Sequence, residues 1–396
     1  MNTTLRILIA LLLVLASHFN LWADACEDFE SCKVSLLTCQ PGEAGYELYG
    51  HTALRVYHPK TGSDLTYNYG IFDFDSPNFT WRFILGETNY MLGVSTFNRF
   101  FYLYAMQGRA VDEQVLNLTA KEKERLVRAL EQNALPENRV YRYDFFSNNC
   151  VTKVIDKIAE AVDGTLVFPQ AMPGQTFRMM LDDHTSVSPW NQFGQSLLLG
   201  ADADTLVGLR EQCFSPVYTQ RFFKETVVVN QEGVSRPLVT SERVLLHAKS
   251  SITPMSLTPK VVLALLLVLS FCISWLYVKG WKRTFACFDT ALLVIIGLGG
   301  CLLATLCFAS EHPAVSRNYT LLLLHPLTLL YLPLQWLLKR KEKTNVTAYL
   351  QLLFVAAYIV CVDVFQIQEP TIELNLIAAT IAVLNLAKIY KERVGD

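Results

Sequence analysis

Five apolar stretches near the C-terminus constrain the fold of this chain more than any other feature. They follow one another at 261–278, 288–308, 319–338, 347–365 and 372–389. About 20 apolar residues suffice for a membrane-spanning helix, and within hydrocarbon a backbone satisfies its hydrogen bonds only as a helix or a closed barrel. The sequence therefore predicts an all-α bundle of five membrane helices over residues 261–396, with Pro326 and Pro333 kinking the third helix.

The charges between these stretches predict the orientation of the bundle. The loops after the first, third and fifth stretches are basic, whereas the loops at 310–318 and 366–371 carry only Glu311, Arg317 and Glu369. Basic loops stay on the cytoplasmic side of a membrane, so everything before residue 261 is predicted to lie outside. The basic positions are Lys279, Lys282, Arg283, Lys339, Arg340, Lys341, Lys343, Lys388, Lys391 and Arg393.

The N-terminus independently predicts export. Arg6 precedes an apolar run at 7–16, and Ala23-Asp24-Ala25 fits the small-x-small rule for signal peptidase. We therefore expect a signal peptide at 1–25, an exported domain at 26–250 and a linker at 251–260. An uncleaved anchor and lipidation of Cys26 are the alternatives, although Ala23 and Asp24 make a poor lipidation box.

The cysteine count indicates a free thiol in the exported part. Five of the ten cysteines lie there, and an odd number leaves at least one without a partner in the chain. We expect Cys150 to be that free thiol, while a buried or disulfide-bonded cysteine is the alternative. The other four are Cys26, Cys32 and Cys39, which are clustered and could pair, and Cys213.

Cys150 is predicted to begin an amphipathic helix. Asn148 and Asn149 are suitable capping residues just before it. Unpaired N–H groups and the helix dipole at such a position lower a thiol pKa, and the same N–H groups could stabilise an oxyanion. Cys150 is therefore the candidate nucleophile. The apolar positions at helical spacing are Val151, Val154, Ile155, Ile158 and Val162.

His51 is the candidate general base and acid for this thiol. Residues 54–57, a turn at 59–62 and residues 64–72 are typical of a β-hairpin. If the turn centres near 60–61, His51 pairs close to Gly70, and Asn68 lies diagonally on the same face. Asn68 is then the candidate orienter of the imidazole, or else a structural strand asparagine.

Other residues compete for these roles or fall outside them. Glu43, Glu47 and Asp73 are rival orienters, and His58 and His184 are predicted to be solvated. The net charge of −2 argues against a nucleic-acid binder. Metal-ligand spacing and glycine-rich phosphate loops are missing from the sequence, so we expect no metal and no other cofactor.

Five motifs, in this order and followed by a multi-span tail, resemble the bacterial lipoprotein N-acyltransferase family Lnb. The order of histidine before cysteine is also similar to circularly permuted NlpC-type papain-like domains. The likeness covers nearly the whole chain. The motifs are YGHTALRV at 49–56, YNYG at 67–70, NCVT at 149–152, TFR at 176–178 and LLLG at 197–200.

The resemblance implies an α+β papain-like domain in the periplasm, anchored in the bacterial inner membrane. It implies that Cys150 and His51 transfer an acyl chain from a membrane phospholipid to the N-terminal cysteine amine of a diacylglyceryl lipoprotein. The alternatives are a membrane-tethered thiol hydrolase, acting as a murein peptidase, murein amidase or lipid esterase, and a non-catalytic envelope scaffold.

Three further features have open interpretations. The aromatic-rich stretch 79–106 either packs in the core or lines an acyl-chain pocket or the interface. Arg178 is expected in a structural salt bridge, with contact to a lipid phosphate as the alternative. His325, Asp363 and Asn375 are expected to form one polar cluster near the outer membrane surface, for a lipid headgroup, for docking of the exported domain, or for bundle stability alone.

Overall fold

The computed structural model describes residues 29–72, 76–249, 257–339 and 346–394. The predicted signal peptide, Cys26 and its pairing, Asp73 and most of the predicted linker lie outside these ranges. The chain forms two compact units that interleave along the sequence. The first comprises Met1–Phe74, Asn89–Met172 and Gly208–Ser251, and the second Asp75–Thr88, Pro173–Val207 and Ile252–Asp396. The domain division at 251–260 stays a prediction.

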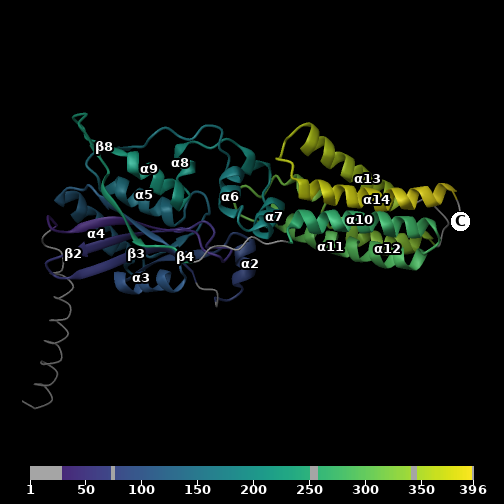
Figure 1. Cartoon of the computed structure of the whole chain (residues 1–396), viewed down its shortest axis with the longest axis horizontal. Coiled ribbons are helices and arrows are strands. Elements are labelled where there is room, and N and C mark those ends of the chain that lie inside the picture. Colours follow the sequence, from purple (N-terminus) through teal and green to yellow (C-terminus); the bar gives the residue numbers. More distant parts are fainter. Residues whose placement is uncertain (1–28, 73–75, 250–256, 340–345, 395–396) are drawn as a thin grey trace, which may run out of the picture. The chain divides into compact units, whose positions relative to one another are not determined.

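A mixed α and β architecture forms the first unit (Figure 1). Its large antiparallel sheet has the strand order β10-β5-β1-β2-β3-β4-β6. A smaller antiparallel sheet has the order β7-β8-β9. The strands of the large sheet are β1 Lys33–Cys39, β2 His51–His58, β3 Ser63–Ile71, β4 Asn89–Thr96, β5 Val111–Leu116, β6 Val140–Arg142 and β10 Val239–Leu246; those of the small sheet are β7 Thr165–Val167, β8 Val227–Val229 and β9 Ser235–Pro237.

Helices cover both faces of the large sheet (Figure 1). Leu37 and Ala53 pack with Phe100 and Tyr104 of one helix. Because side chains alternate along a strand, Leu36 points to the other face of the sheet. That face is covered by α5, which begins at Cys150, and by the preceding helix α4. The helices of this unit are α3 Phe97–Met106, α4 Ala120–Ala134, α5 Cys150–Ala161, α8 Leu209–Gln212 and α9 Pro216–Glu225.

The β2–β3 hairpin has the register that the sequence predicts. Pairs run from His58 opposite Ser63 to Leu54 opposite Tyr67. Gly70 lies close to His51, since a Cβ on Gly70 would be 3.6 Å from the His51 Cε1. The prediction of a solvated His58 is wrong, because its side chain is only 3% exposed. Its Nδ1 accepts a hydrogen bond from the Thr61 N–H and so closes the turn.

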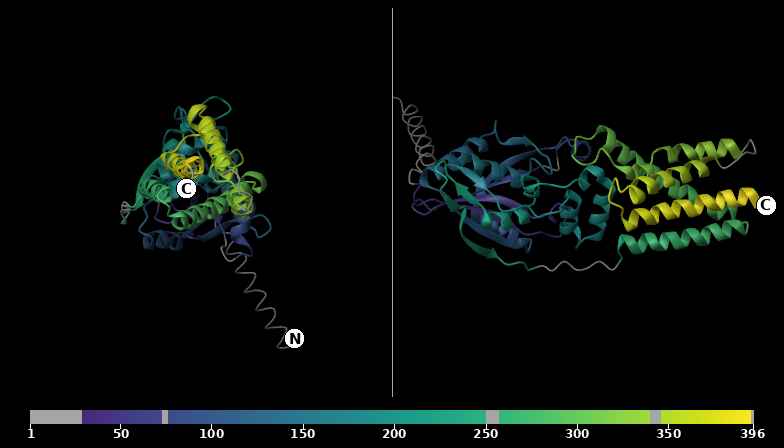
Figure 2. Two further views of the ribbon diagram at one scale, coloured as in Figure 1. Left: turned by 90° about the vertical axis from the view of Figure 1, so that its right-hand side faces the viewer. Right: turned by 90° about the horizontal axis from the view of Figure 1, so that it is seen from above.

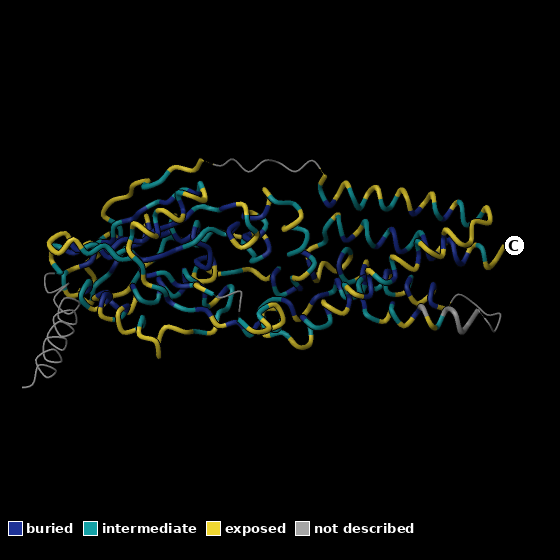
Figure 3. The backbone as a smooth tube through the Cα atoms, turned by 90° about the horizontal axis from the view of Figure 1, so that it is seen from below, coloured by how far each residue is buried: buried dark blue, intermediate teal, exposed yellow. Residues whose placement is uncertain are grey.

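The second unit contains long apolar helices that lie side by side (Figure 2). In the described part of the chain, four helices are long and apolar enough to cross a membrane: Pro259–Val278, Lys282–Ala309, Val346–Val364 and Ile372–Val394. Their outward faces are largely exposed (Figure 3). The corresponding elements are α10 Pro259–Val278, α11 Lys282–Ala309, α13 Val346–Tyr358 with the π-helix Ile359–Val364, and α14 Ile372–Val394.

The third predicted span is interrupted. A 3₁₀ turn, η2 Tyr319–Leu322, and helix α12 Leu327–Lys339 flank a break at Pro326, and Pro333 lies inside α12. The apolar stretch Tyr319–Tyr331 is shorter than the other four. Gly297 and Gly300 of α11 let this segment approach closely, since a Cβ on Gly300 would lie 2.4 Å from the His325 carbonyl carbon.

Four short elements from earlier in the sequence also belong to the second unit, where they contact the loops between the apolar helices. They are α2 Phe79–Ile84, α6 Phe177–Thr185, α7 Pro189–Leu198 and the 3₁₀ helix η1 Ala201–Asp204. Leu85 accepts a hydrogen bond from the Glu311 N–H, and the Gly200 and Ala201 N–H groups donate to Ala314 and Arg317. These segments therefore cap one end of the bundle.

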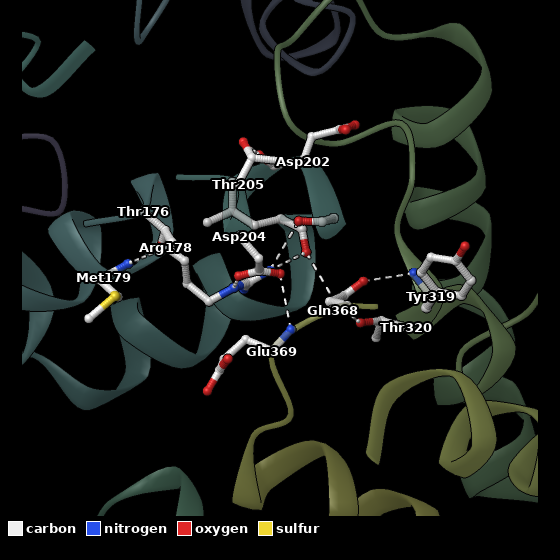
Figure 4. Close-up of polar contacts among 12 residues, drawn as sticks. Thr176, Arg178, Met179, Asp202, Asp204, Thr205, Tyr319, Thr320, Gln368 and Glu369 are labelled. Atoms are coloured by element: carbon white, nitrogen blue, oxygen red, sulfur yellow. Dashed lines mark hydrogen bonds and ion pairs between the residues drawn. The ribbon is translucent and has the colours of Figure 1, made fainter. Parts of the chain in front are cut away.

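The buried Arg178 holds this cap together (Figure 4). Its Nε donates to Asp204 at 2.5 Å, and its Nη2 donates to the carbonyls of Leu199 and Gly200. Asp204 in turn accepts from the Glu369 N–H of the last interhelical loop. The expected structural salt bridge of Arg178 is confirmed.

The predicted polar cluster of His325, Asp363 and Asn375 is only partly correct. Asn375 donates to Asp363 at 3.1 Å, and Tyr358 donates to Asn375 at 3.4 Å. His325 does not join them, because its ring packs against Tyr331 and Phe354 instead.

The sequence analysis missed a buried ion pair at the other end of the bundle. Lys388 Nζ lies 2.7 Å from Asp289 Oδ1, and both side chains are less than a tenth exposed. Lys388 also donates to Asn385, whose amide donates to Gln351 at 2.5 Å. Helices α11, α13 and α14 are thus joined by one polar network.

We expect Lys388→Met to destabilise the bundle by about 3 kcal/mol, because removing one partner leaves the other charge buried and unpaired. Thermal unfolding of the full chain in detergent measures this effect. Adding Asp289→Leu should recover most of the loss, whereas the exposed Lys279→Met serves as the control. A single variant as stable as the parent would show that the pair contributes nothing.

Candidate active site

Cys150 is the first residue of α5, and Asn149 fixes it there. The Asn149 Oδ1 accepts from the N–H groups of Val151 and Thr152, and the Thr152 hydroxyl accepts from the Asn149 N–H. The predicted helix start and cap are therefore confirmed. The Val151 and Thr152 N–H groups, which we expected to be available for an oxyanion, are already engaged by this cap.

The structure brings Cys150 and His51 together in a hydrogen bond. Burial alone would raise the pKa of Cys150, but the charge and hydrogen bond of His51, together with the N–H groups of Thr52 and Val151, lower it below its ordinary value. Burial alone would lower the pKa of His51, yet Cys150 and Asn68 raise it overall. Both shifts favour a thiolate–imidazolium pair.

Asn68 contacts the other side of the imidazole. The His51 Nε2 lies 2.5 Å from the Asn68 Oδ1, so an Nε2–H that donates to this oxygen leaves Nδ1 as the nitrogen available to the Cys150 sulfur. The three candidate residues come from β2, β3 and the first position of α5, and all belong to the first unit.

Gly70 and Thr52 are site residues that the sequence analysis did not single out. A Cβ on Gly70 would lie 3.5 Å from the Cys150 Cβ and 3.6 Å from the His51 Cε1. Its φ of +93° also favours glycine. Thr52 contributes its backbone N–H to the Cys150 sulfur. Backbone donors leave no residue-type signal in a sequence. The hairpin register did place Gly70 near His51, but it did not indicate its role in leaving room for the Cys150 side chain.

Two stacked tyrosines lie near enough to Cys150 for its charge to act on them. Tyr90 stacks on Tyr143 with ring centroids 4.0 Å apart. Burial, with a smaller effect of the Cys150 charge, raises the pKa of Tyr90 to about 12 and raises that of Tyr143 as well. The phenols therefore stay neutral at physiological pH.

The rival residues do not contact the imidazole in the described structure. Glu47 pairs with Arg109 at 3.5 Å, Glu43 is exposed, and Asp73 lies outside the described residues. His184 is buried in α6, which lowers its pKa, so the prediction that it is solvated is wrong.

Among the described residues of the first unit, Cys39, Cys150 and Cys213 carry free thiols. The expectation that Cys150 is unpaired is confirmed. Burial raises the pKa of Cys39 to about 12 and that of Cys213 to about 11. Cys150 is therefore the one of these three with a lowered pKa.

The aromatic-rich stretch 79–106 divides between the two interpretations. Helix α3 buries Phe100 and Tyr104 but exposes Tyr102, and α2 buries none of its residues, with Trp81 54% exposed. Core packing therefore accounts for only part of this stretch.

No group of three or more potential metal ligands occurs among the residues the structure describes.

An α+β domain with a cysteine–histidine site, followed by apolar helices, defines a membrane protein with an extracytoplasmic thiol domain. Two family models match the chain: the Lnb N-terminal periplasmic domain over residues 18–183 and the Lnb transmembrane domain over residues 249–393. The chain belongs to the Lnb family, and its thiol domain is periplasmic. No curated protein and no solved structure matches it.

The electrostatics predict selective alkylation of Cys150. Iodoacetamide at pH 7 should modify Cys150 much faster than Cys39 or Cys213, as peptide mass spectrometry would show. His51→Ala should slow the modification about tenfold, because without the imidazolium the Cys150 pKa rises and less thiolate is present. The midpoint of the rate–pH profile should move upward. Exposed His247→Ala is the matched control, and an unmoved midpoint in His51→Ala would refute the pairing.

Proposed function

We propose that this protein is a lipoprotein N-acyltransferase that acts through an acyl-thioester on Cys150. Membership of the Lnb family supports a role of this kind. The observation that carries the proposal is the hydrogen-bonded arrangement of Cys150, His51 and Asn68 in a periplasmic domain joined to membrane helices. A thiolate, a proton carrier and an orienting acceptor are the groups that acyl transfer requires.

In the first step, the Cys150 thiolate attacks an ester carbonyl of a membrane phospholipid. The S–C bond forms, and we assign stabilisation of the developing oxyanion to the Thr52 N–H, which interacts with the Cys150 sulfur. The ester C–O bond then breaks, and the protonated His51 donates its proton to the departing alkoxide. The products are a lysophospholipid and an acyl-thioester enzyme.

In the second step, the α-amine of a diacylglyceryl-modified N-terminal cysteine attacks the thioester. The N–C bond forms, the S–C bond breaks, and neutral His51 takes the proton from the amine. This restores the thiolate–imidazolium pair and releases an amide-linked lipoprotein. Asn68 holds the imidazole in one orientation through both proton transfers.

Mass spectrometry tests this proposal on the acyl-thioester enzyme and on the N-acylated lipoprotein. The full-length protein in phospholipid bilayers should gain the mass of one acyl chain on Cys150, and Cys150→Ser should not. In cells, a reporter lipoprotein should carry the N-acyl mass with the parent or the Cys213→Ala control, and lose it with Cys150→Ser or His51→Ala.

Other outcomes would overturn the proposal. Release of free fatty acid without lipoprotein acylation indicates a lipid esterase, and cleavage of murein peptides indicates a peptidase. Full replacement of the parent in cells by both Cys150→Ser and His51→Ala would indicate a scaffold.

Asn68→Ala should lower the rate of Cys150 acylation by about a hundredfold, because a misoriented imidazole loses its alignment with the sulfur. Asn68→Asp, which keeps an acceptor for the His51 N–H, should restore much of the rate. A purely structural asparagine would instead give a lowered unfolding temperature with an unchanged rate per folded molecule, so both quantities are measured on each variant.

A further inference from the structure

The second unit contains a cavity that the proposed chemistry does not use. Its volume is about 440 Å³, and residues of α11, η2, the break before α12, and α13 line it. Pockets for small molecules commonly measure about 300–1,000 Å³. The wall is mostly apolar, with Phe308, Leu322 and Phe354 among its residues.

This cavity lies where lipid can reach it. Two of its wall residues remain exposed on the bundle, Phe308 at 81% and Leu327 at 45%. Both lie at apolar helix ends next to the loop 310–318, which the charge pattern places on the periplasmic side. In a membrane, such an apolar surface meets the acyl chains of the outer leaflet.

Arg317 supplies a cation to the lining. Its Nε donates to Asp202 at 2.7 Å and its Nη2 pairs with the same carboxylate, yet its side chain remains 64% exposed. A guanidinium has five N–H donors, so Asp202 leaves donors for a second anion. Arginine at a membrane interface is well suited to bind phosphate.

His325 adds a polar group whose hydrogen-bonding capacity is unused. It lines the cavity, it is only 5% exposed, and its Nδ1 has no hydrogen-bond partner in the described structure. Buried polar groups nearly always have partners, and an ionisable side chain inside a membrane usually marks a ligand or a pathway. The oxygens of a lipid backbone would provide the missing partner.

We propose that this cavity binds a glycerophospholipid of the outer leaflet. One acyl chain occupies the apolar part between α11 and α13, the phosphate contacts Arg317, and an ester or glycerol oxygen contacts His325. The role of this lipid as acyl donor rests on the proposed function, whereas its binding is a separate property that can be measured without turnover.

Photocrosslinking tests the site directly. The full-length protein is placed in vesicles of phosphatidylethanolamine and phosphatidylglycerol that contain a phosphatidylethanolamine with a diazirine in its acyl chain. Crosslinks should concentrate on peptides that contain residues 304–308 or 321–327. Ala304→Trp, which fills the cavity, should reduce them about tenfold. Ile295→Trp is the matched control, since Ile295 is an exposed position on the same helix.

Substitutions at the two polar residues test the headgroup contacts. His325→Phe keeps a ring but removes both nitrogens, and Arg317→Gln removes the charge; each should weaken crosslinking of the phosphatidylethanolamine probe about tenfold. A diazirine-labelled diacylglycerol, which lacks the phosphate, should be insensitive to Arg317→Gln. Equal sensitivity of the two probes would overturn the contact between Arg317 and phosphate.

The crosslinking and acylation results can fail independently. Crosslinks spread evenly over the helices, and unchanged by Ala304→Trp, would overturn the cavity as a lipid site even if Cys150 becomes acylated. Concentrated crosslinks without any acyl adduct on Cys150 would support the lipid site and reject the proposed transferase.

Discussion

The site depends on one amide side chain, that of Asn149. Its Oδ1 accepts from the first turn of α5, and its Nδ2 donates to the carbonyls of Phe145 and Phe214 at 2.9 and 2.8 Å. The side chain therefore ties the helix start to the loop before it and to the segment before α9. Aspartate could accept from the helix N–H groups but could not donate to the two carbonyls. Serine has only one hydroxyl for both tasks. The position of the Cys150 sulfur follows from this one residue.

Opposing electrostatic effects set the charge state of the site. Burial disfavours the thiolate and the imidazolium alike, and each ion is retained because the other lies beside it. The charged pair is therefore a coupled unit, and a change to either partner alters the pKa of both. The balance is set against burial by His51, Cys150, Asn68 and two backbone N–H groups, while the charge of Arg109 opposes the imidazolium.

Local patterns in the sequence predicted the local structure well. The hairpin register placed His51 opposite Gly70, and helical spacing with an asparagine before it placed Cys150 at a helix start. Both predictions depend on neighbours in the chain, whose geometry the sequence determines. They bring Asn68 and His51 to one face, although the catalytic roles of these residues stay a prediction.

Predictions that required long-range contacts were less successful. His58 was predicted to be solvated because it lies at a turn, and His184 because it lies in a polar stretch, yet folding buries both. The ion pair of Lys388 with Asp289 joins α14 to α11, which lie far apart in the sequence, and nothing near either residue in the sequence indicates it. Similarly, His325 was grouped with Asp363 by predicted depth alone, whereas depth does not determine which way a side chain faces around a helix.

The cap segments change how this protein can be divided. Residues 75–88 and 173–207 are surrounded in the sequence by the thiol domain, but they pack on the loops of the membrane helices. A secreted fragment that ends before α10 would keep these segments and lose the surface that satisfies the hydrogen bonds of Leu85, Gly200 and Asp204. Such a fragment would be soluble, but we expect these two segments to lose their ordered structure. The second unit is therefore built from segments that precede the membrane helices as well as from the helices themselves.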